Sequence, residues 1–280
     1  MVAIEVETPR YDDSRIATLQ RPRRVWAVGA VRGERDRLLA LHAAVAPRFV
    51  VGDRLVYLGD MLGPGADPAG TIDELLRFRI AVLAMRGMDA PDVVFLRGAQ
   101  EEMWQKLLQL HFALEPARVL DWMLAHGLGA TLAAYGGAAE DGYRASRGGA
   151  KTLARWTAGL RAAHAGRPGH GAWLSALRCA AIAGGDPAKP PECLFVNAGL
   201  DPARPLAAQR DSFWWQPGGF ERIAAPWQGF RRIVRGTTPN RDGVETGTVT
   251  LSLDAGCGLG GTLAAALLSP SGEILETVEA

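Results

Sequence analysis

Three charged side chains follow short apolar runs of the sequence within a few residues: Arg32, Asp60 and Arg97. The runs, at residues 25–28, 55–58 and 93–96, are typical of buried strands, and helical spacing follows each of them. This alternation predicts parallel strands whose carboxyl ends meet at one edge of a sheet, where ligands bind. A carboxylate is a ligand for metal ions, and guanidinium groups suit phosphate. The chemistry open to such a site is therefore metal binding or anion binding.

The segments around these residues form motifs in a fixed order along the chain. They are VWAVGAVRG at residues 25–33, LVYLGDMLGPG at 55–65, FLRGAQEEM at 95–103, LFVNAGL at 194–200 and GTTP at 236–239. Further matches are WMLAHGLGATLAAYG at 122–136, DSFWWQ at 211–216 and LDAGCGLGGTL at 253–263. In this order and spacing the motifs resemble calcineurin-like metallophosphoesterases, and more narrowly the bacterial serine/threonine protein phosphatases. The resemblance runs from about residue 26 to about residue 276.

The resemblance implies that most residues of the family's chemistry have been replaced. Five metal ligands of the family are replaced, by Ala30, Arg32, Ala99, Asn197 and Thr237. Gly63 and Pro64 stand where the family has an Asp and a phosphate-binding Arg. Gln100 replaces the His that protonates the leaving group. Of the family's six metal ligands only Asp60, the bridging carboxylate, remains. The glycines and acidic residues that frame the motifs are still present.

The replacement residues predict a site that neither binds metal nor hydrolyses phosphoesters. Hydrolysis of a phosphoester by two metals needs cations about 3.5–4 Å apart, held by ligands from several loops. Ala30 and Ala99 have no donor atoms, and Thr237 is a weak neutral ligand. The permanent charge of Arg32 repels an incoming cation. We therefore expect no catalytic residues and no metal cofactor; the alternative is a pair of Mn or other divalent ions.

Arg32 carries the main structural prediction. A guanidinium at a former metal position would compensate the remaining carboxylate, so we expect an Arg32–Asp60 ion pair. The resemblance places Arg97 beside bound phosphate, and Arg32 and Arg97 together could hold an anion without metal. The competing interpretation is that both arginines fill the vacated pocket and pair with carboxylates.

The leading functional hypothesis is a pseudophosphatase, an inactive member of the fold that acts by binding or scaffolding. Its candidate partners are a phosphorylated protein and an active relative, and the sequence does not choose between them. The first alternative is an enzyme, a weak or altered metal-dependent serine/threonine phosphatase or other phosphoesterase. The second is a sensor that binds phosphate or a phosphometabolite without metal.

Composition excludes several classes of partner. A net charge of +1 gives no bulk attraction to nucleic acid or to a membrane surface. The first residues are charged and lack an apolar segment, so we expect no signal peptide and a cytoplasmic protein. The three cysteines, Cys179, Cys193 and Cys257, have no metal-binding spacing and are predicted to be free buried thiols.

The predicted fold class is α/β, with two packed mixed β-sheets flanked by helices. The resemblance makes this the four-layer αββα metallophosphoesterase fold with a helical lid at about residues 115–190. Residues 1–22 are expected to be a loose arm, and residues 23–280 a single domain. Helices are predicted over residues 35–46, over 72–83 with Thr71 as N-cap, and over 101–114, and the second sheet from Cys193 onward.

Histidines and tryptophans are assigned mainly to packing. None of the five histidines lies in a motif loop. His164 and His170 are the least implausible pair of metal ligands, but surface or packing roles are expected for all five. Trp214, Trp215 and Trp227 are expected to pack in the core or lid rather than to form an exposed interaction stripe.

Overall fold

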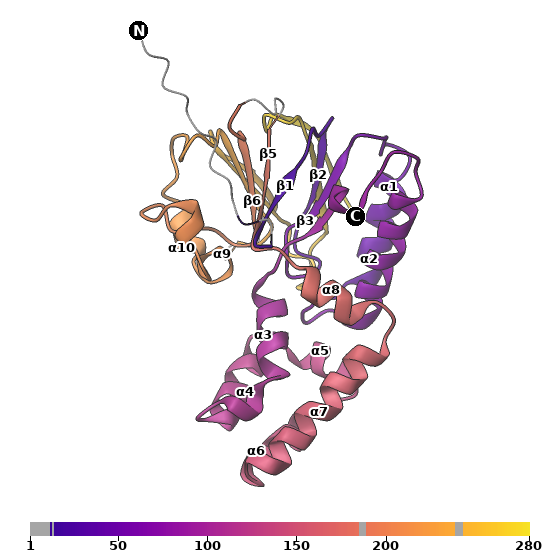
Figure 1. Cartoon of the computed structure of the whole chain (residues 1–280), viewed down its shortest axis with the longest axis vertical. Helices are drawn as coiled ribbons and strands as arrows, with labels where there is room; N and C mark the ends of the chain where they lie inside the picture. Colours follow the sequence, from indigo (N-terminus) through magenta and orange to yellow (C-terminus); the bar gives the residue numbers. More distant parts are fainter. Residues whose placement is uncertain (1–11, 13, 185–188, 239–242) are drawn as a thin grey trace.

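Two β-sheets form the centre of the molecule (Figure 1). The computed structural model describes residues 12, 14–184, 189–238 and 243–280. In these residues, the larger sheet has six strands in the order β1 (Ile16–Leu19), β5 (Ala180–Ala183), β6 (Cys193–Val196), β7 (Arg232–Arg235), β9 (Thr250–Asp254) and β8 (Gly243–Thr246). The smaller has five, in the order β11 (Ile274–Glu279), β10 (Ala264–Leu268), β2 (Val25–Val28), β3 (Arg54–Tyr57) and β4 (Val93–Phe95).

The first three βα units build the parallel part of the smaller sheet, as the sequence predicts. Strands β2, β3 and β4 are parallel neighbours, with Val25 opposite Arg54 and Leu55 opposite Val93. Strand β10 joins this sheet antiparallel to β2. The predicted strand positions are correct to within one residue.

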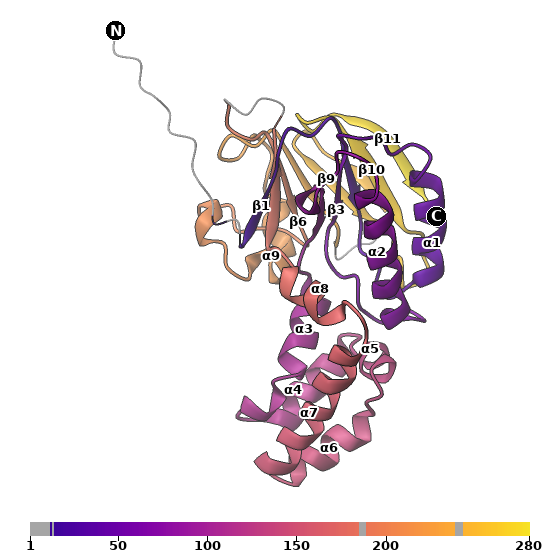
Figure 2. The same cartoon turned by 45° about the vertical axis from the view of Figure 1, so that its right-hand side comes forward.

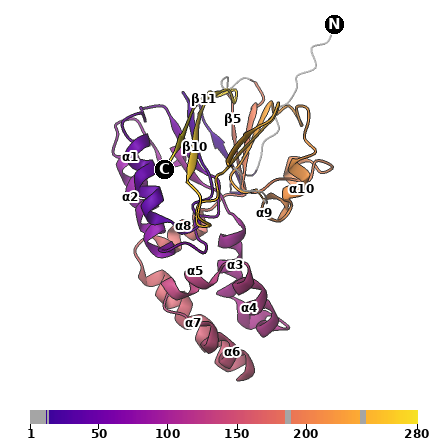
Figure 3. The same cartoon turned by 180° about the vertical axis from the view of Figure 1, so that it is seen from behind.

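Helices cover the outer faces of both sheets, which confirms the predicted two-sheet fold flanked by helices. Helices α1 (Arg35–Val45) and α2 (Pro68–Leu83) lie on the smaller sheet (Figure 2). The short helices α9 (Ser212–Trp215) and α10 (Pro217–Phe220) lie beside the larger sheet (Figure 3). The order of layers is therefore helix, sheet, sheet, helix.

Each central strand contributes to two apolar layers. In β2, Trp26 and Val28 pack toward α1 and α2, whereas Val25 and Ala27 pack between the sheets. In β6, Phe195 faces the space between the sheets and Leu194 faces the side of α9. Because successive side chains of a strand point to opposite faces, burial on both faces produces continuous apolar runs rather than alternation.

A helical extension projects from the sheets on the side where the motif loops lie (Figure 1). Its helices are α3 (Ala99–Leu107), η2 (Leu110–Phe112), α4 (Pro116–Ala125), α5 (Gly129–Ala134), α6 (Ala139–Arg147), α7 (Ala150–Gly166) and α8 (His170–Ala176). The chain returns to the larger sheet at β5, inside the range 115–190 predicted for the lid. The predicted end of the lid was therefore too late, because four alanine-rich residues, AAIA, gave no clear strand signal.

Three other predicted boundaries were wrong. Ile16–Leu19, assigned to the loose arm, is the edge strand β1, paired in parallel with β5; residues 1–11 and 13 lie outside the described part. Helix α2 starts at Pro68 rather than after Thr71, because the Asp67 carboxylate caps it by accepting the Gly70 N–H at 2.8 Å. The helix predicted over 101–114 ends at Leu107. Among the described residues, no helix is long and apolar enough to cross a bilayer.

Candidate functional site

The motif loops of both sheets meet at the carboxyl ends of the strands. The Ala30 N–H donates to the Gly236 carbonyl (3.0 Å), which joins the loop after β2 to the loop after β7. The Asn197 amide, after β6, donates to the Leu58 carbonyl (2.8 Å) after β3. The contacts are close enough to require glycine at position 98, where a Cβ would lie 2.3 Å from the Asp60 nitrogen. The motif loops therefore meet at one edge, as the alternation of strands and helices in the sequence predicted.

Asp60 lies at the centre of these loops and is saturated by neutral donors. One carboxylate oxygen accepts the Gln100 backbone N–H at 2.9 Å. The other accepts the Thr237 hydroxyl at 2.6 Å and the Asn197 amide at 3.3 Å. Asn197 and Thr237, which replace histidines of the resembled family, thus turn donors rather than metal-binding lone pairs toward Asp60. Asp60 is only 3% exposed, so water does not compete for these bonds.

The predicted Arg32–Asp60 ion pair is wrong, because Arg32 pairs with Asp254. The two guanidinium nitrogens lie 2.8 and 2.6 Å from the two Asp254 carboxylate oxygens, a bidentate geometry. Arg32 also donates to the Cys257 carbonyl at 3.1 Å. Burial opposes the charge, but the Asp254 carboxylate and, more weakly, Asp60 raise the pKa of Arg32 above its ordinary value. Asp254 also accepts backbone N–H groups from Thr238 (2.8 Å) and Gly256 (3.1 Å).

Arg97 does not join this ion pair. Its guanidinium forms an ion pair with Glu102 at 2.8 Å and donates to the Gln105 side chain. Both arginines therefore pair with carboxylates, as the competing interpretation predicted. An anion held by Arg32 and Arg97 would have to compete with Asp254 and Glu102, and such binding stays a prediction.

Glu101 fixes the loop that presents Asp60. Its two carboxylate oxygens accept the backbone N–H groups of Gly98, Asp60, Met61 and Leu62 at 2.8–2.9 Å. It thereby caps α3, as expected, and also holds Asp60 at a φ of +51°, a conformation that non-glycine residues rarely adopt. Burial, and after it the charge of Asp60, raises the pKa of Glu101 to about 7, although the N–H donors oppose this shift.

The remaining replaced positions serve packing. Ala30 is buried and contributes only its backbone to the site. The Gly63 N–H lies 3.3 Å from the Thr131 hydroxyl of α5, so the Gly63–Pro64 loop meets the helical extension. Ala99 begins α3 and packs partly against the core of the larger sheet. The Gln100 amide donates to the His126 carbonyl at 2.9 Å, which ties this loop to α4.

The side chains present do not fit a pair of divalent metals. Asp60 and Asp254 are engaged by protein donors, and Arg32 places a fixed positive charge beside both. The Asn197 amide group is oriented by two acceptors, the Leu58 carbonyl and Asp60, so its NH₂ faces the centre. In the described part of the chain, no three His, Cys, Asp or Glu side chains come together as a metal-binding group.

Exposed apolar side chains lie next to residues that contact the motif loops. Trp122 of α4 is 44% exposed and stacks near His126, whose carbonyl binds Gln100. It meets Trp215 of α9, 38% exposed, in an edge-to-face contact with 5.6 Å between ring centroids. Leu259, 46% exposed, follows Gly258, which packs on Arg32. The expectation for the tryptophans holds for the buried Trp214 but not for Trp215.

The histidine pair singled out as possible metal ligands lies away from the motif loops. His164 and His170 come together, with ring centroids 5.8 Å apart, inside the helical extension. His170 binds the Tyr135 hydroxyl (2.7 Å) and the Asp73 carboxylate (2.9 Å), and Trp104 donates to His164. Burial lowers the pKa of His164 to about 4, so it is neutral at pH 7. The three cysteines are free thiols as predicted, although Cys179 is only partly buried.

Sequence reasoning missed Asp254 as a site residue. The residue belongs to a recognised motif and is the last residue of β9 (Thr250–Asp254), whose sequence alternates polar and apolar side chains. A carboxylate at the carboxyl end of a strand is the signal that could have singled it out.

Comparison with known proteins supports the fold. No family model matches the chain, and no curated protein matches it. A crystal structure whose description proposes a diadenosine tetraphosphatase is 22% identical, with a TM-score of 0.55 over 95% of this chain and 97% of that one. A serine/threonine phosphatase from Saccharomyces cerevisiae is 14% identical, with a TM-score of 0.51 over 95% and 84% of the two chains. A cold-active protein tyrosine phosphatase of a psychrophilic Shewanella species is 15% identical, with a TM-score of 0.51 over 95% and 85%. The chain has the metallophosphoesterase fold.

Proposed function

We propose that this metallophosphoesterase-fold protein is a pseudophosphatase, catalytically inactive and acting by binding. One observation carries the proposal: the Arg32 guanidinium is locked onto Asp254 by two charge-assisted hydrogen bonds of 2.8 and 2.6 Å in the middle of the site. Both groups are almost completely buried. A metal ion entering this position would have to displace the Arg32 guanidinium, whose charge Asp254 already neutralises.

The electrostatics support loss of hydrolysis rather than reduced hydrolysis. Two-metal chemistry needs open carboxylate and imidazole lone pairs to activate water and to stabilise the in-line displacement. Here Asp60 accepts three donors and Asp254 accepts four, with Arg32 counted twice. Ala30 and Ala99, at two of the positions that the resemblance assigns to metal ligands, have no polar side-chain atoms, and the Thr237 hydroxyl at a third donates to Asp60.

Two exposed tryptophans beside the site, Trp122 and Trp215, support a binding role; we call this pair the rim. Trp122 and Trp215 are partly exposed, in contact with each other, and belong to different parts of the fold. Exposed tryptophans with restrained rings are favoured anchors in protein interfaces. We propose that a protein partner, either phosphorylated or an active relative, contacts this rim.

Metal stoichiometry and turnover test the inactive half of the proposal. Purified protein is saturated with Mn²⁺, desalted and analysed by mass spectrometry for bound metal, and hydrolysis of p-nitrophenyl phosphate is measured in parallel. We expect almost no retained metal and a rate equal to that of an Asp60→Ala variant. One or two retained ions per chain, with a rate that Asp60→Ala abolishes, would establish the enzyme instead.

The binding half is tested with matched baits. Wild-type protein and a Trp122→Ala/Trp215→Ala double variant are used for affinity capture from the source cell, with quantitative proteomics. A partner retained by the wild type and lost from the double variant supports the rim. If the two baits retain the same proteins, the rim has no role in binding.

A further inference from the structure

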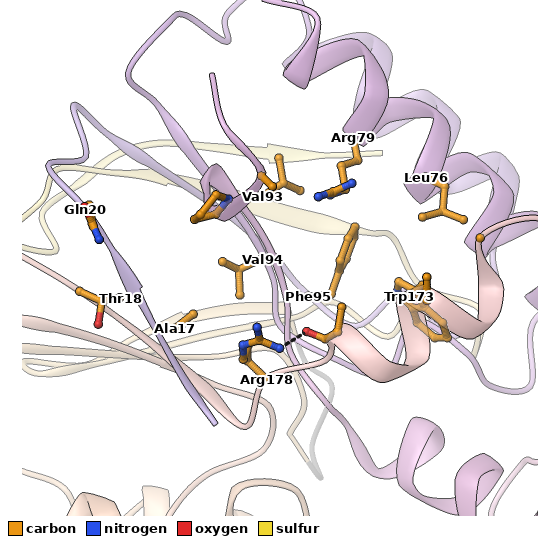
Figure 4. Close-up of a pocket in the computed structure, with 15 residues that line it drawn as sticks. Ala17, Thr18, Gln20, Leu76, Arg79, Val93, Val94, Phe95, Trp173 and Arg178 are labelled. Atoms are coloured by element: carbon orange, nitrogen blue, oxygen red, sulfur yellow. Dashed lines mark hydrogen bonds between the residues drawn. The ribbon is translucent and has the colours of Figure 1, made fainter. Parts of the chain in front are cut away.

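A cavity lies at the joint edge of the two sheets (Figure 4). It has a volume of about 560 Å³ and is lined by residues of β1, β4, α2 and α8. This volume falls within the range of small-molecule sites in proteins, about 300–1,000 Å³. None of its lining residues belongs to the candidate site described above.

The lining combines an apolar floor with two arginines. Val94 and Phe95 of β4 and Leu76 of α2 contribute apolar surface. Arg79 of α2 and Arg178, just before β5, lie on different sides of Val94 (Figure 4). No Asp or Glu is among the described residues that line the cavity. The walls thus suit a molecule with an apolar body and a negative charge.

The two arginines differ in how many of their hydrogen-bond donors are occupied. Arg79 is partly buried and makes no hydrogen bond or ion pair with any described residue. Arg178 donates to the Ala176 carbonyl at 2.6 Å. Both guanidinium groups keep their positive charge, and Arg79 is the one of the two whose donors have no partner among the described residues.

Trp173 completes the apolar part of the wall. It lines the cavity and is 2% exposed. Its indole N–H is fully buried, so Trp173 contributes packing to the cavity rather than a hydrogen-bond donor.

We propose that this cavity binds a small amphipathic monocarboxylate. Its carboxylate pairs with the Arg79 guanidinium, and its hydrocarbon body packs on Val94 and Phe95. A carboxylate fits the guanidinium fork of Arg79, the lining arginine without a partner among the described residues. The site is independent of the vacated phosphoesterase site, so each can be tested without the other.

Decanoate and decan-1-ol are the probes that test the proposal. Isothermal titration calorimetry on the whole chain is expected to show saturable binding of one decanoate per chain. The alcohol has the same hydrocarbon body without the charge, and we expect at least tenfold weaker binding of it, because a buried charge-assisted pair is lost. Absence of saturable decanoate binding overturns the proposal.

Three variants locate the binding. Arg79→Met keeps an apolar stem and removes the charge, so decanoate affinity should fall at least tenfold while decanol affinity changes little. Ala172→Trp places an indole in the cavity and should abolish the binding of both probes. Arg86→Met, an exposed arginine outside the lining, is the matched control and should leave both affinities unchanged.

A further filling variant separates binding in this cavity from loss of stability and from binding elsewhere on the protein. If Ala172→Trp lowers the thermal midpoint, Ala90→Trp fills the same cavity from an exposed position on its opposite wall. Decanoate binding that survives both a filling variant and Arg79→Met lies elsewhere on the protein and overturns the assignment of this cavity.

Discussion

The Arg32 guanidinium and the Asp254 carboxylate form a bidentate ion pair between residues that are 222 positions apart in the sequence. The pair joins the loop after β2 in one sheet to the end of β9 in the other. It therefore ties the two sheets together at the point where the fold would otherwise present ligands to a metal. Unfolding measurements on variants of this ion pair report its contribution to stability separately from its effect on metal binding.

Removal of only one partner of this pair should be strongly destabilising. Arg32→Met leaves a buried unpaired carboxylate, and we expect the free energy of unfolding to fall by about 3–5 kcal/mol. The double variant Arg32→Met/Asp254→Asn neutralises that carboxylate and keeps an acceptor for the Thr238 and Gly256 N–H groups, so it should recover part of the loss. Urea unfolding measures both. Arg118→Met, in an exposed pair with Glu115, is the control and should cost less than about 1 kcal/mol. If the double variant is less stable than Arg32→Met, by the full cost of the second substitution, Arg32 and Asp254 are not coupled.

Glu101 should make stability depend on pH. Its folded-state pKa is raised to about 7 from 4.5, so the folded protein binds more protons than the unfolded chain between these values. The stability that Glu101 contributes is therefore present below pH 4.5 and is lost as the pH rises toward 7, by at most about 3 kcal/mol.

The difference in unfolding free energy between wild type and Glu101→Gln isolates this contribution, because glutamine does not titrate. We expect the difference to decrease from pH 4.5 to pH 7. A difference that is flat over this range would mean that the four backbone N–H groups keep Glu101 ionised throughout.

Substitution of two adjacent tryptophans by alanine should lower the free energy of unfolding by very different amounts. Trp214 is 9% exposed and belongs to the core of the larger sheet, so Trp214→Ala should cost about 3–5 kcal/mol of unfolding free energy. Trp215 is 38% exposed, and Trp215→Ala should cost less than about 1 kcal/mol. Thermal and urea unfolding of the two single variants make the comparison. A large loss for Trp215→Ala would show that it is a structural residue and would weaken its assignment to a binding rim.

Single reversions toward the resembled motifs should remain inert. The relevant changes are Ala30→Asp, Arg32→His, Ala99→Asn, Gln100→His, Asn197→His and Thr237→His. Ligands of a two-metal site act as a unit, so one added ligand gives no site. Arg32→His is expected to fail for a second reason, because it leaves Asp254 without its guanidinium partner.

Hydrolysis of p-nitrophenyl phosphate with excess Mn²⁺ is the measurement, and the parent chain is the baseline. Turnover clearly above the parent in any one revertant would show that the site is closer to activity than its ligand set indicates.

The sequence by itself determined the parallel strands of the smaller sheet and the edge at which their loops meet. Residues 25–28, 55–58 and 93–96 are apolar runs followed by helical spacing, and this local pattern is enough to specify parallel strands with loops at a common edge. Local signals failed where they were weak. Ile16–Leu19 and Ala180–Ala183 are only four residues each, and they become strands by pairing with each other at a sheet edge.

Only the tertiary structure decided which carboxylate meets Arg32. Asp60 follows β3 and Asp254 is the last residue of β9, and the sequence contains no information on their distances from a side chain in a third loop. Asp60 is satisfied by Thr237, Asn197 and the Gln100 N–H, whereas Asp254 presents both oxygens to the guanidinium. The choice depends on how the two sheets pack and on where each loop places its donors. These are long-range relationships, and they exist only once the chain has folded.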